Sequence, residues 1–107
     1  MAKFIPEKIS IITIASGHLC LELTEKVGWE NFTIFAEQLV ALLGGAVVNK
    51  ADGVEICVWK IRLQDCELRL VYEDYPTMVS LESSSDAGDE CLREVQHSLS
   101  VKYENLK

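Results

Sequence analysis

A chain of 107 residues with 49% hydrophobic and 25% charged residues has the size and composition of one globular domain, which we expect to span residues 1–107, and it is too apolar for intrinsic disorder. The formal net charge of −7 argues against binding to nucleic acid or to an anionic membrane surface, because both attract basic proteins. The apolar run at residues 39–46 is too short to span a bilayer and no signal peptide opens the chain, so we expect a cytoplasmic protein.

Two strands are predicted first, at residues 8–15 and 19–24, because β-branched residues and alternation dominate both stretches. A two-residue turn at Gly17 and His18 would give this hairpin one apolar and one mixed face. The pairs expected on the apolar face are Ile14 with Leu21 and Ile12 with Leu23.

A helix is predicted over residues 29–43, where apolar residues recur three and four positions apart and would lay one face on a core. Gly44 and Gly45 then supply the left-handed residue that commonly ends a helix. The apolar positions of this helix are Phe32, Phe35, Ala36, Leu39, Val40 and Leu43.

Four further strands are expected at residues 46–50, 54–63, 66–73 and 77–82. The turns that join them are Asp52-Gly53, Gln64-Asp65 and Asp74-Tyr75-Pro76, all rich in turn-forming residues. A two-residue turn in the middle hairpin makes one of its faces apolar throughout, and this should be the core face. The pairs on that face are Trp59 with Leu70, Ile61 with Leu68, Leu63 with Cys66, and Cys57 with Tyr72.

The opposite face of the same hairpin would place Lys60 beside Arg69, a like-charge pair that destabilises a sheet. Aligning the last hairpin so that Leu81 lies beside Leu70 also brings Glu82 next to Arg69 and neutralises this repulsion. The agreement between the two faces supports this register.

A final helix is predicted to start near residues 84–86, where Ser and Asp can cap free amides, while Asp89 and Glu90 complement the positive helix end. Its apolar stripe would be Ala87, Cys91, Val95 and Leu99. The order is then ββ-α-ββββ-α. We predict an α+β fold, a two-layer sandwich in which an antiparallel sheet carries both helices on one face.

The other face of that sheet is the predicted binding surface. A solvated face normally carries Thr, Ser, Lys and Glu, whereas branched apolar residues rimmed by charge are typical of an interface. The alternative is that the first hairpin or the chain's tail covers this face. The apolar residues expected there are Val47, Ile56, Val58, Val71 and Met78, flanked by Lys60, Arg62, Glu67, Arg69 and Glu82.

No pattern in the sequence indicates catalysis, a metal or a cofactor. The cysteines form no C-x-x-C pair and are expected to be free thiols; they are Cys20, Cys57, Cys66 and Cys91. His18 and His97 lack a nucleophile or a second pair of ligands nearby. Residues 82–90 lack the calcium-loop spacing, so helix capping accounts for their acids, with an acidic docking patch as the alternative. The glycine pair follows a helix, whereas a phosphate loop opens one.

Residues 29–99 resemble a family of short, acidic gammaproteobacterial proteins described only as a domain of unknown function. The matching features are the helix from Phe32 to Leu43, Lys50-Ala-Asp-Gly-Val54, Trp59, Leu70-Val-Tyr-Glu-Asp74 and Ser80-Leu-Glu82. The resemblance implies a bacterial cytoplasmic protein and no catalytic residues.

These observations favour a small protein-binding or regulatory protein, of the accessory or immunity type, that acts on a protein partner or as a homodimer. A secretion-chaperone-like acidic dimer is one alternative, since its size, charge and mixed α/β content are similar. A second alternative, from another class, is a small enzyme that uses the carboxylates of Glu73, Asp74 and Glu82.

Overall fold

The computed structural model describes residues 6, 8–53, 55–74 and 77–104, and within them it confirms an α+β fold with a six-stranded antiparallel sheet. The predicted start of a strand at Val54 and the predicted turn residues Tyr75 and Pro76 lie outside the described residues. The elements are β1 (Ser10–Thr13), β2 (Leu19–Thr24), α1 (Trp29–Leu43), β3 (Ala46–Asp52), β4 (Ile56–Leu63), β5 (Cys66–Asp74), β6 (Thr77–Glu82) and α2 (Asp86–Glu104).

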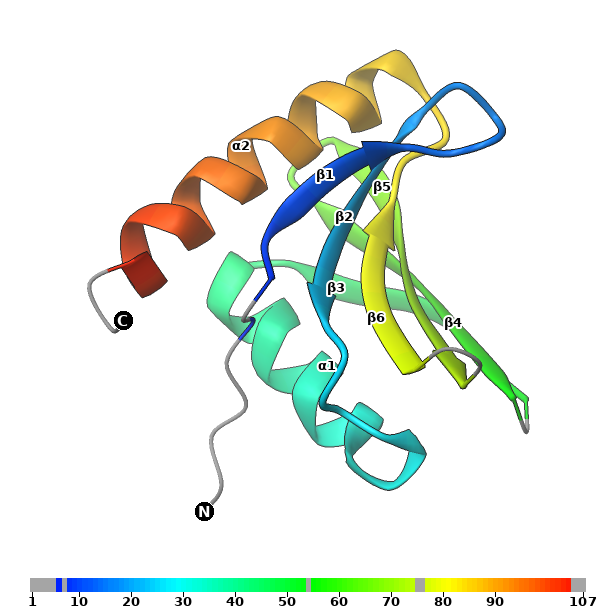
Figure 1. Ribbon diagram of the computed structural model, residues 1–107. Helices are drawn as coiled ribbons and strands as arrows, with labels where there is room; N and C mark the ends of the chain where they lie inside the picture. The colour runs from blue at the N-terminus through cyan, green and yellow to red at the C-terminus, as the bar shows by residue number, and fades with distance from the viewer. Residues whose placement is uncertain (1–5, 7, 54, 75–76, 105–107) are drawn as a thin grey trace.

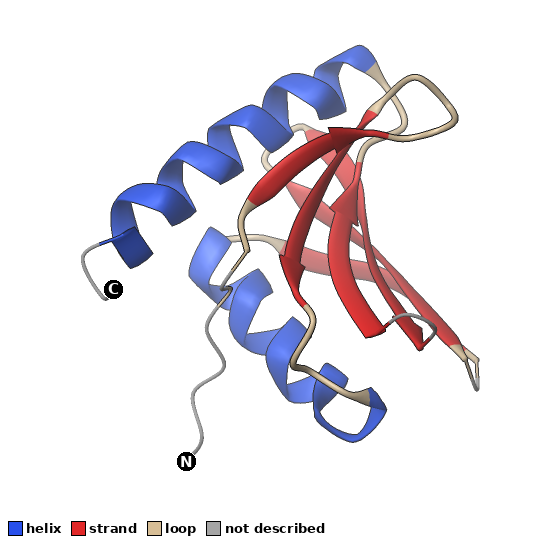
Figure 2. Cartoon of the chain, viewed as in Figure 1, coloured by secondary structure: helices blue, strands red, loops and turns tan. Residues whose placement is uncertain are grey.

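The strands lie in the order β1-β2-β6-β5-β4-β3 (Figure 1). The last strand of the chain therefore returns to pair with β2, with Leu21 opposite Leu81. This long-range pair joins the first hairpin to the other four strands, so that one sheet runs through the whole molecule. In Figure 2 both helices lie on the same side of it. Neither described helix combines the length and the apolar content that crossing a membrane requires.

The predicted registers of the last two hairpins are confirmed. Trp59 lies opposite Leu70 and Ile61 opposite Leu68, while Arg69 lies opposite Glu82. The turn between β4 and β5 consists of Gln64 and Asp65, and Gln64 adopts a left-handed φ of 56°. A tight turn leaves the strands no freedom to slide, which is why local turn reasoning succeeds here.

The predicted register of the first hairpin is wrong by three residues. Leu21 pairs with Ile11, where Ile14 was expected, and Ile12 pairs with Cys20 in place of Leu23. The cause is a longer loop, in which the Ile14 N–H donates to the His18 carbonyl at 3.0 Å. Because three is odd, the shift exchanges the two faces of β1. Ile11 packs against the core and Ile12 is 42% exposed.

The core lies between the helices and one face of the sheet. Phe32 of α1 contacts Trp59 edge-on, with ring centroids 5.4 Å apart, and Tyr72 at 5.7 Å. Tight aromatic clusters of this kind add to the stabilisation from buried area. The helices contribute the buried residues Phe32, Phe35, Ala36, Leu39, Val40, Leu92, Val95 and Leu99. The prediction also placed Leu92 beside the stripe of the last helix, and Leu92 is buried; one correction is needed at the start, where Ala87 is exposed and Gly88 is buried.

The ends of α1 follow from two local features. Gly44 takes the left-handed conformation at φ 70° as predicted, and the N–H of Gly45 closes the last turn on the Val40 carbonyl at 3.0 Å. At the other end Gly28 offers no side-chain cap. The first turn is closed by the backbone, since the N–H of Asn31 donates to the Gly28 carbonyl at 3.1 Å.

Candidate functional site

The outer face is the surface of the sheet that points away from the helices. Side chains alternate along a strand, and the registers place the members of this face side by side. They are Ser10 and Ile12 of β1, Cys20 and Glu22 of β2, Met78, Ser80 and Glu82 of β6, Glu67, Arg69, Val71 and Glu73 of β5, Ile56, Val58, Lys60 and Arg62 of β4, and Ala46, Asn49 and Ala51 of β3.

The middle of the outer face carries short side chains. Ser80 lies opposite Val71, and Val71 lies opposite Val58, so these residues form a row across three strands. Val71 is only 2% exposed, Ser80 6% and the nearby Cys20 4%, although both described helices lie on the other side of the sheet (Figure 2). The centre of the outer face is therefore a row of short, mostly apolar side chains that are almost fully buried.

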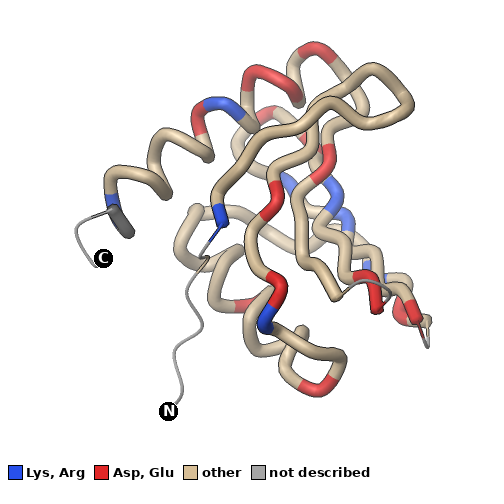
Figure 3. The backbone as a smooth tube through the Cα atoms, in the orientation of Figure 1, with Lys and Arg blue, Asp and Glu red and all other residues tan. Residues whose placement is uncertain are grey.

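Charged side chains flank this row. Arg69 Nη2 lies 3.3 Å from Glu82 Oε1, as the predicted register requires, and Arg62 Nη2 lies 3.0 Å from Glu67 Oε2. These exposed pairs contribute about 1 kcal/mol each at most, so their main effect is on specificity. In Figure 3 the basic positions of β4 and β5 lie together, away from the hairpin tips where acidic positions gather.

One predicted member of the binding surface, Val47, is not on it. Val47 lies opposite Ile61, which faces the helices, and it packs against the core. A register shift between Val47 and Asn49 inserts Val48 as an extra residue in β3, and such a bulge exchanges the faces of the residues on either side. Val48 is 49% exposed as a consequence. The structure places the other six predicted residues on the outer face: Ile56, Val58, Val71, Met78, Lys60 and Arg69.

The carboxylates suggested for a small enzyme do not converge. Asp74 Oδ1 accepts a hydrogen bond from the Tyr72 hydroxyl at 3.0 Å. Burial, and then this bond to Asp74, raises the pKa of Tyr72 above its usual value. Glu82 pairs with Arg69, which is four residues before Glu73 on β5, so the two glutamates lie about 13 Å apart along the sheet. Asp74 is bonded to a core residue, and Glu73 and Glu82 lie at separate points of the outer face.

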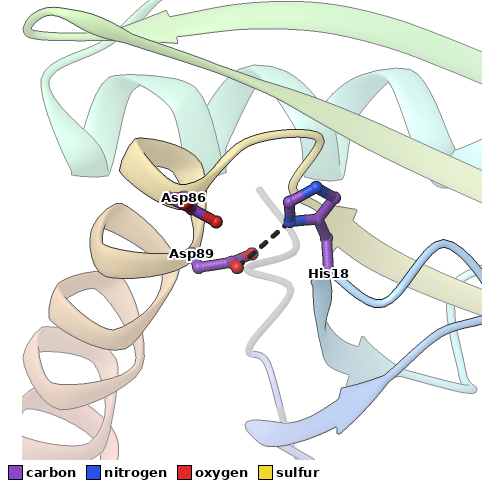
Figure 4. Close-up of side chains that lie close together, drawn as sticks. All are labelled: His18, Asp86 and Asp89. Carbon is purple, nitrogen blue, oxygen red and sulfur yellow. Dashed lines mark hydrogen bonds and ion pairs between the residues drawn. The ribbon is translucent and has the colours of Figure 1, made fainter.

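A second cluster joins residues that are far apart in the sequence (Figure 4). His18 Nδ1 lies 3.1 Å from Asp89 Oδ2, and the backbone N–H of Leu19 donates to Asp89 Oδ1 at 3.0 Å. The backbone bond from Leu19, followed by the smaller contribution of His18, lowers the pKa of Asp89 to about 2 against the opposing effect of desolvation. Ser85 caps the helix independently, since its Oγ accepts the N–H of Gly88 at 2.9 Å.

This cluster fastens the loop between β1 and β2 to the start of α2. One ligand atom each of His18, Asp86 and Asp89 lie within 4.8 Å of one another, a spacing that one cation would need. However, both oxygens of Asp89 already accept hydrogen bonds, and Asp86 is exposed. The sequence predicted helix capping for Asp89 and gave no sign of its contact with His18, because 71 residues separate the two.

Residues 9–102 match a family described as a protein of unknown function, DUF3630. The chain belongs to this family. No curated protein and no solved structure is significantly similar to it. The region shared with DUF3630 extends from just before β1 almost to the end of α2. It therefore includes the entire outer face, the bulge in β3 and the contact between His18 and Asp89.

Proposed function

We propose that this DUF3630 protein is a cytoplasmic, non-catalytic protein-binding domain of accessory or regulatory type, and that its outer face pairs two copies of the chain. The row of Val58, Val71 and Ser80 across the outer face carries this proposal. In a two-layer sandwich with both helices on one face, the second sheet face either meets water or meets a partner. Val58 and Val71 are apolar and charged residues flank the row, an arrangement that is typical of an interface.

The distribution of charge favours a second copy as the occupant. Glu22 and Glu82 lie on β2 and β6 of the outer face and Lys60 and Arg62 on β4, whereas β5 carries both signs, with Arg69 between Glu67 and Glu73. A two-fold axis parallel to the strands brings the β2 side of one copy over the β4 side of the other. Acidic residues of each copy then face basic residues of its partner, so the face is complementary to itself.

The size of the face agrees with such a dimer. Six strands cover about 29 Å across the sheet and six residues about 20 Å along it, or roughly 600 Å² of flat area. Side chains protrude from the sheet, so the accessible surface is larger than this flat area. It therefore approaches the roughly 800 Å² per partner of a standard stable interface.

The test is the oligomeric state, measured by size-exclusion chromatography with light scattering over a range of concentrations. We expect the wild-type chain to be a dimer and Ile56→Lys with Val58→Lys to be a folded monomer. Ile56 is 47% exposed on the outer face, and Ile34 on α1, at 43%, provides a matched control. Ile34→Lys adds one lysine away from the outer face, against two in the double variant, and should remain dimeric. A monomeric wild type, or a dimer that survives Ile56→Lys with Val58→Lys, would refute the second copy as occupant.

A secretion-chaperone-like role is compatible with the same acidic dimer. The two roles differ in what the dimer carries, because a chaperone would hold an effector segment. Co-purification of the dimer with one secreted protein would favour this role.

A further inference from the structure

A groove of about 300 Å³ lies on the helix side of the sheet, between the turn joining β4 to β5 and the first half of α2. It is lined by two cysteines, Cys66 of β5 and Cys91 of α2, which are both half-buried. Cys66 is close enough to Cys91 to raise the pKa of the Cys91 thiol, and Cys66 Sγ donates a hydrogen bond to the Leu63 carbonyl at 3.4 Å. Two thiols from separate elements thus meet in a place that small molecules can reach.

The other two cysteines of the chain are placed differently. Cys20 is 4% exposed and Cys57 is 3% exposed. They lie on opposite faces of the sheet, since Cys20 belongs to the outer face and Cys57 pairs with Tyr72 in the core. Cys20 and Cys57 therefore do not share a site, whereas Cys66 and Cys91 line one groove.

We infer that Cys66 and Cys91 form a redox-sensitive dithiol, a modification site that closes to an intramolecular disulfide by exchange with a small uncharged disulfide. An uncharged reagent is specified because Asp65, Glu90 and Glu94 line the same groove and repel anions. The site is independent of the proposed pairing of two chains, because it lies on the opposite side of the sheet from the outer face.

The order of the two steps follows from the surroundings of the sulfur atoms. Burial, and then the hydrogen bond and charge of Cys66, raise the pKa of Cys91 to about 12, so Cys91 keeps its proton at neutral pH. Cys66 is therefore the sulfur that attacks first. Its thiolate bonds to one sulfur of the reagent, the reagent's S–S bond breaks, and one reagent thiolate leaves and takes up a proton.

The second step closes the disulfide between Cys66 and Cys91. Once Cys66 is in a mixed disulfide it carries no negative charge, which removes one cause of the high pKa of Cys91. Cys91 loses its proton to solvent and attacks Cys66 Sγ, and the second reagent thiolate leaves and is protonated. Two cysteines lose two electrons in total and the reagent gains two, so one disulfide is exchanged for another.

The experiment treats the purified full-length chain with oxidised 2-mercaptoethanol at neutral pH, blocks free thiols with iodoacetamide, and measures the intact mass and a peptide map. We expect a single-chain mass two hydrogen atoms below that of the untreated chain before blocking, with one link between Cys66 and Cys91 and with iodoacetamide reacting only at Cys20 and Cys57. Cys91→Ser should stop at a single 2-mercaptoethanol adduct on Cys66. Cys20→Ser, the matched control, should form the link as the wild type does.

Three results would overturn the inference. One is recovery of both Cys66 and Cys91 as free thiols after prolonged exposure to the reagent. Another is a link that involves Cys20 or Cys57 or that joins two chains. The third is a stable adduct on Cys91 in the wild type, since it would show that the attack starts at the other sulfur. Oxidised glutathione, which is anionic, should form the link more slowly than oxidised 2-mercaptoethanol.

Discussion

Replacing Gly45 by alanine tests how closely the start of β3 is held against β4. A Cβ atom at this position would overlap Leu63 Cδ2 and lie 2.8 Å from the carbonyl oxygen of Arg62. The carbonyl is part of the backbone, and the Leu63 side chain is 6% exposed, so β4 must move to make room. Overpacking of this kind destabilises a protein by about 1–3 kcal/mol.

The assay is urea unfolding followed by circular dichroism. With a urea dependence of about 1.5 kcal/mol per molar, a loss of about 2 kcal/mol lowers the midpoint by about 1.3 M. Gly28→Ala is the control, because its Cβ would meet no atom within 4 Å and its φ of −88° suits any residue. Alanine is a poorer N-cap than glycine, which destabilises the protein, but it also lowers the entropy of the unfolded chain, which stabilises it. The free energy of unfolding should therefore change by no more than about 0.5 kcal/mol. Equal midpoints for Gly45→Ala and Gly28→Ala would show that β3 has room to move.

Two further predictions concern the loop contacts. Asp89 has a folded-state pKa of about 2, below its ordinary 3.8, so its stabilising contribution is present above about pH 4 and disappears as the pH falls towards 2. Asp89→Asn should lower the urea midpoint at pH 7, and its difference from the wild type should shrink below pH 4; a difference that stays constant down to pH 2 would contradict this assignment. Gln64 has a left-handed φ of 56°, so Gln64→Gly should stabilise the protein by about 0.5–1 kcal/mol in the same assay, whereas Asp65→Gly, at a position without a positive φ, should not.

The sequence determined the features that depend on neighbouring residues. Apolar spacing placed α1, and Gly44 ended it, because a helix must turn one side to the core and a left-handed residue must close it. The register of β4 with β5 was likewise predictable, since a turn of two residues fixes which side chains meet. Six of the seven side chains proposed for the binding surface followed from these registers.

Only the tertiary structure decided the features that depend on distant segments. The longer turn at Gly17 and the bulge at Val48 differ in local energy only slightly from a two-residue turn and a regular strand. The pairing of β2 with β6 and the packing of the core decide which of these forms. Nothing near His18 in the chain announces Asp89, and nothing near Cys66 announces Cys91. Such contacts form only when α2 packs on the sheet beside α1. That packing depends on segments from the whole chain.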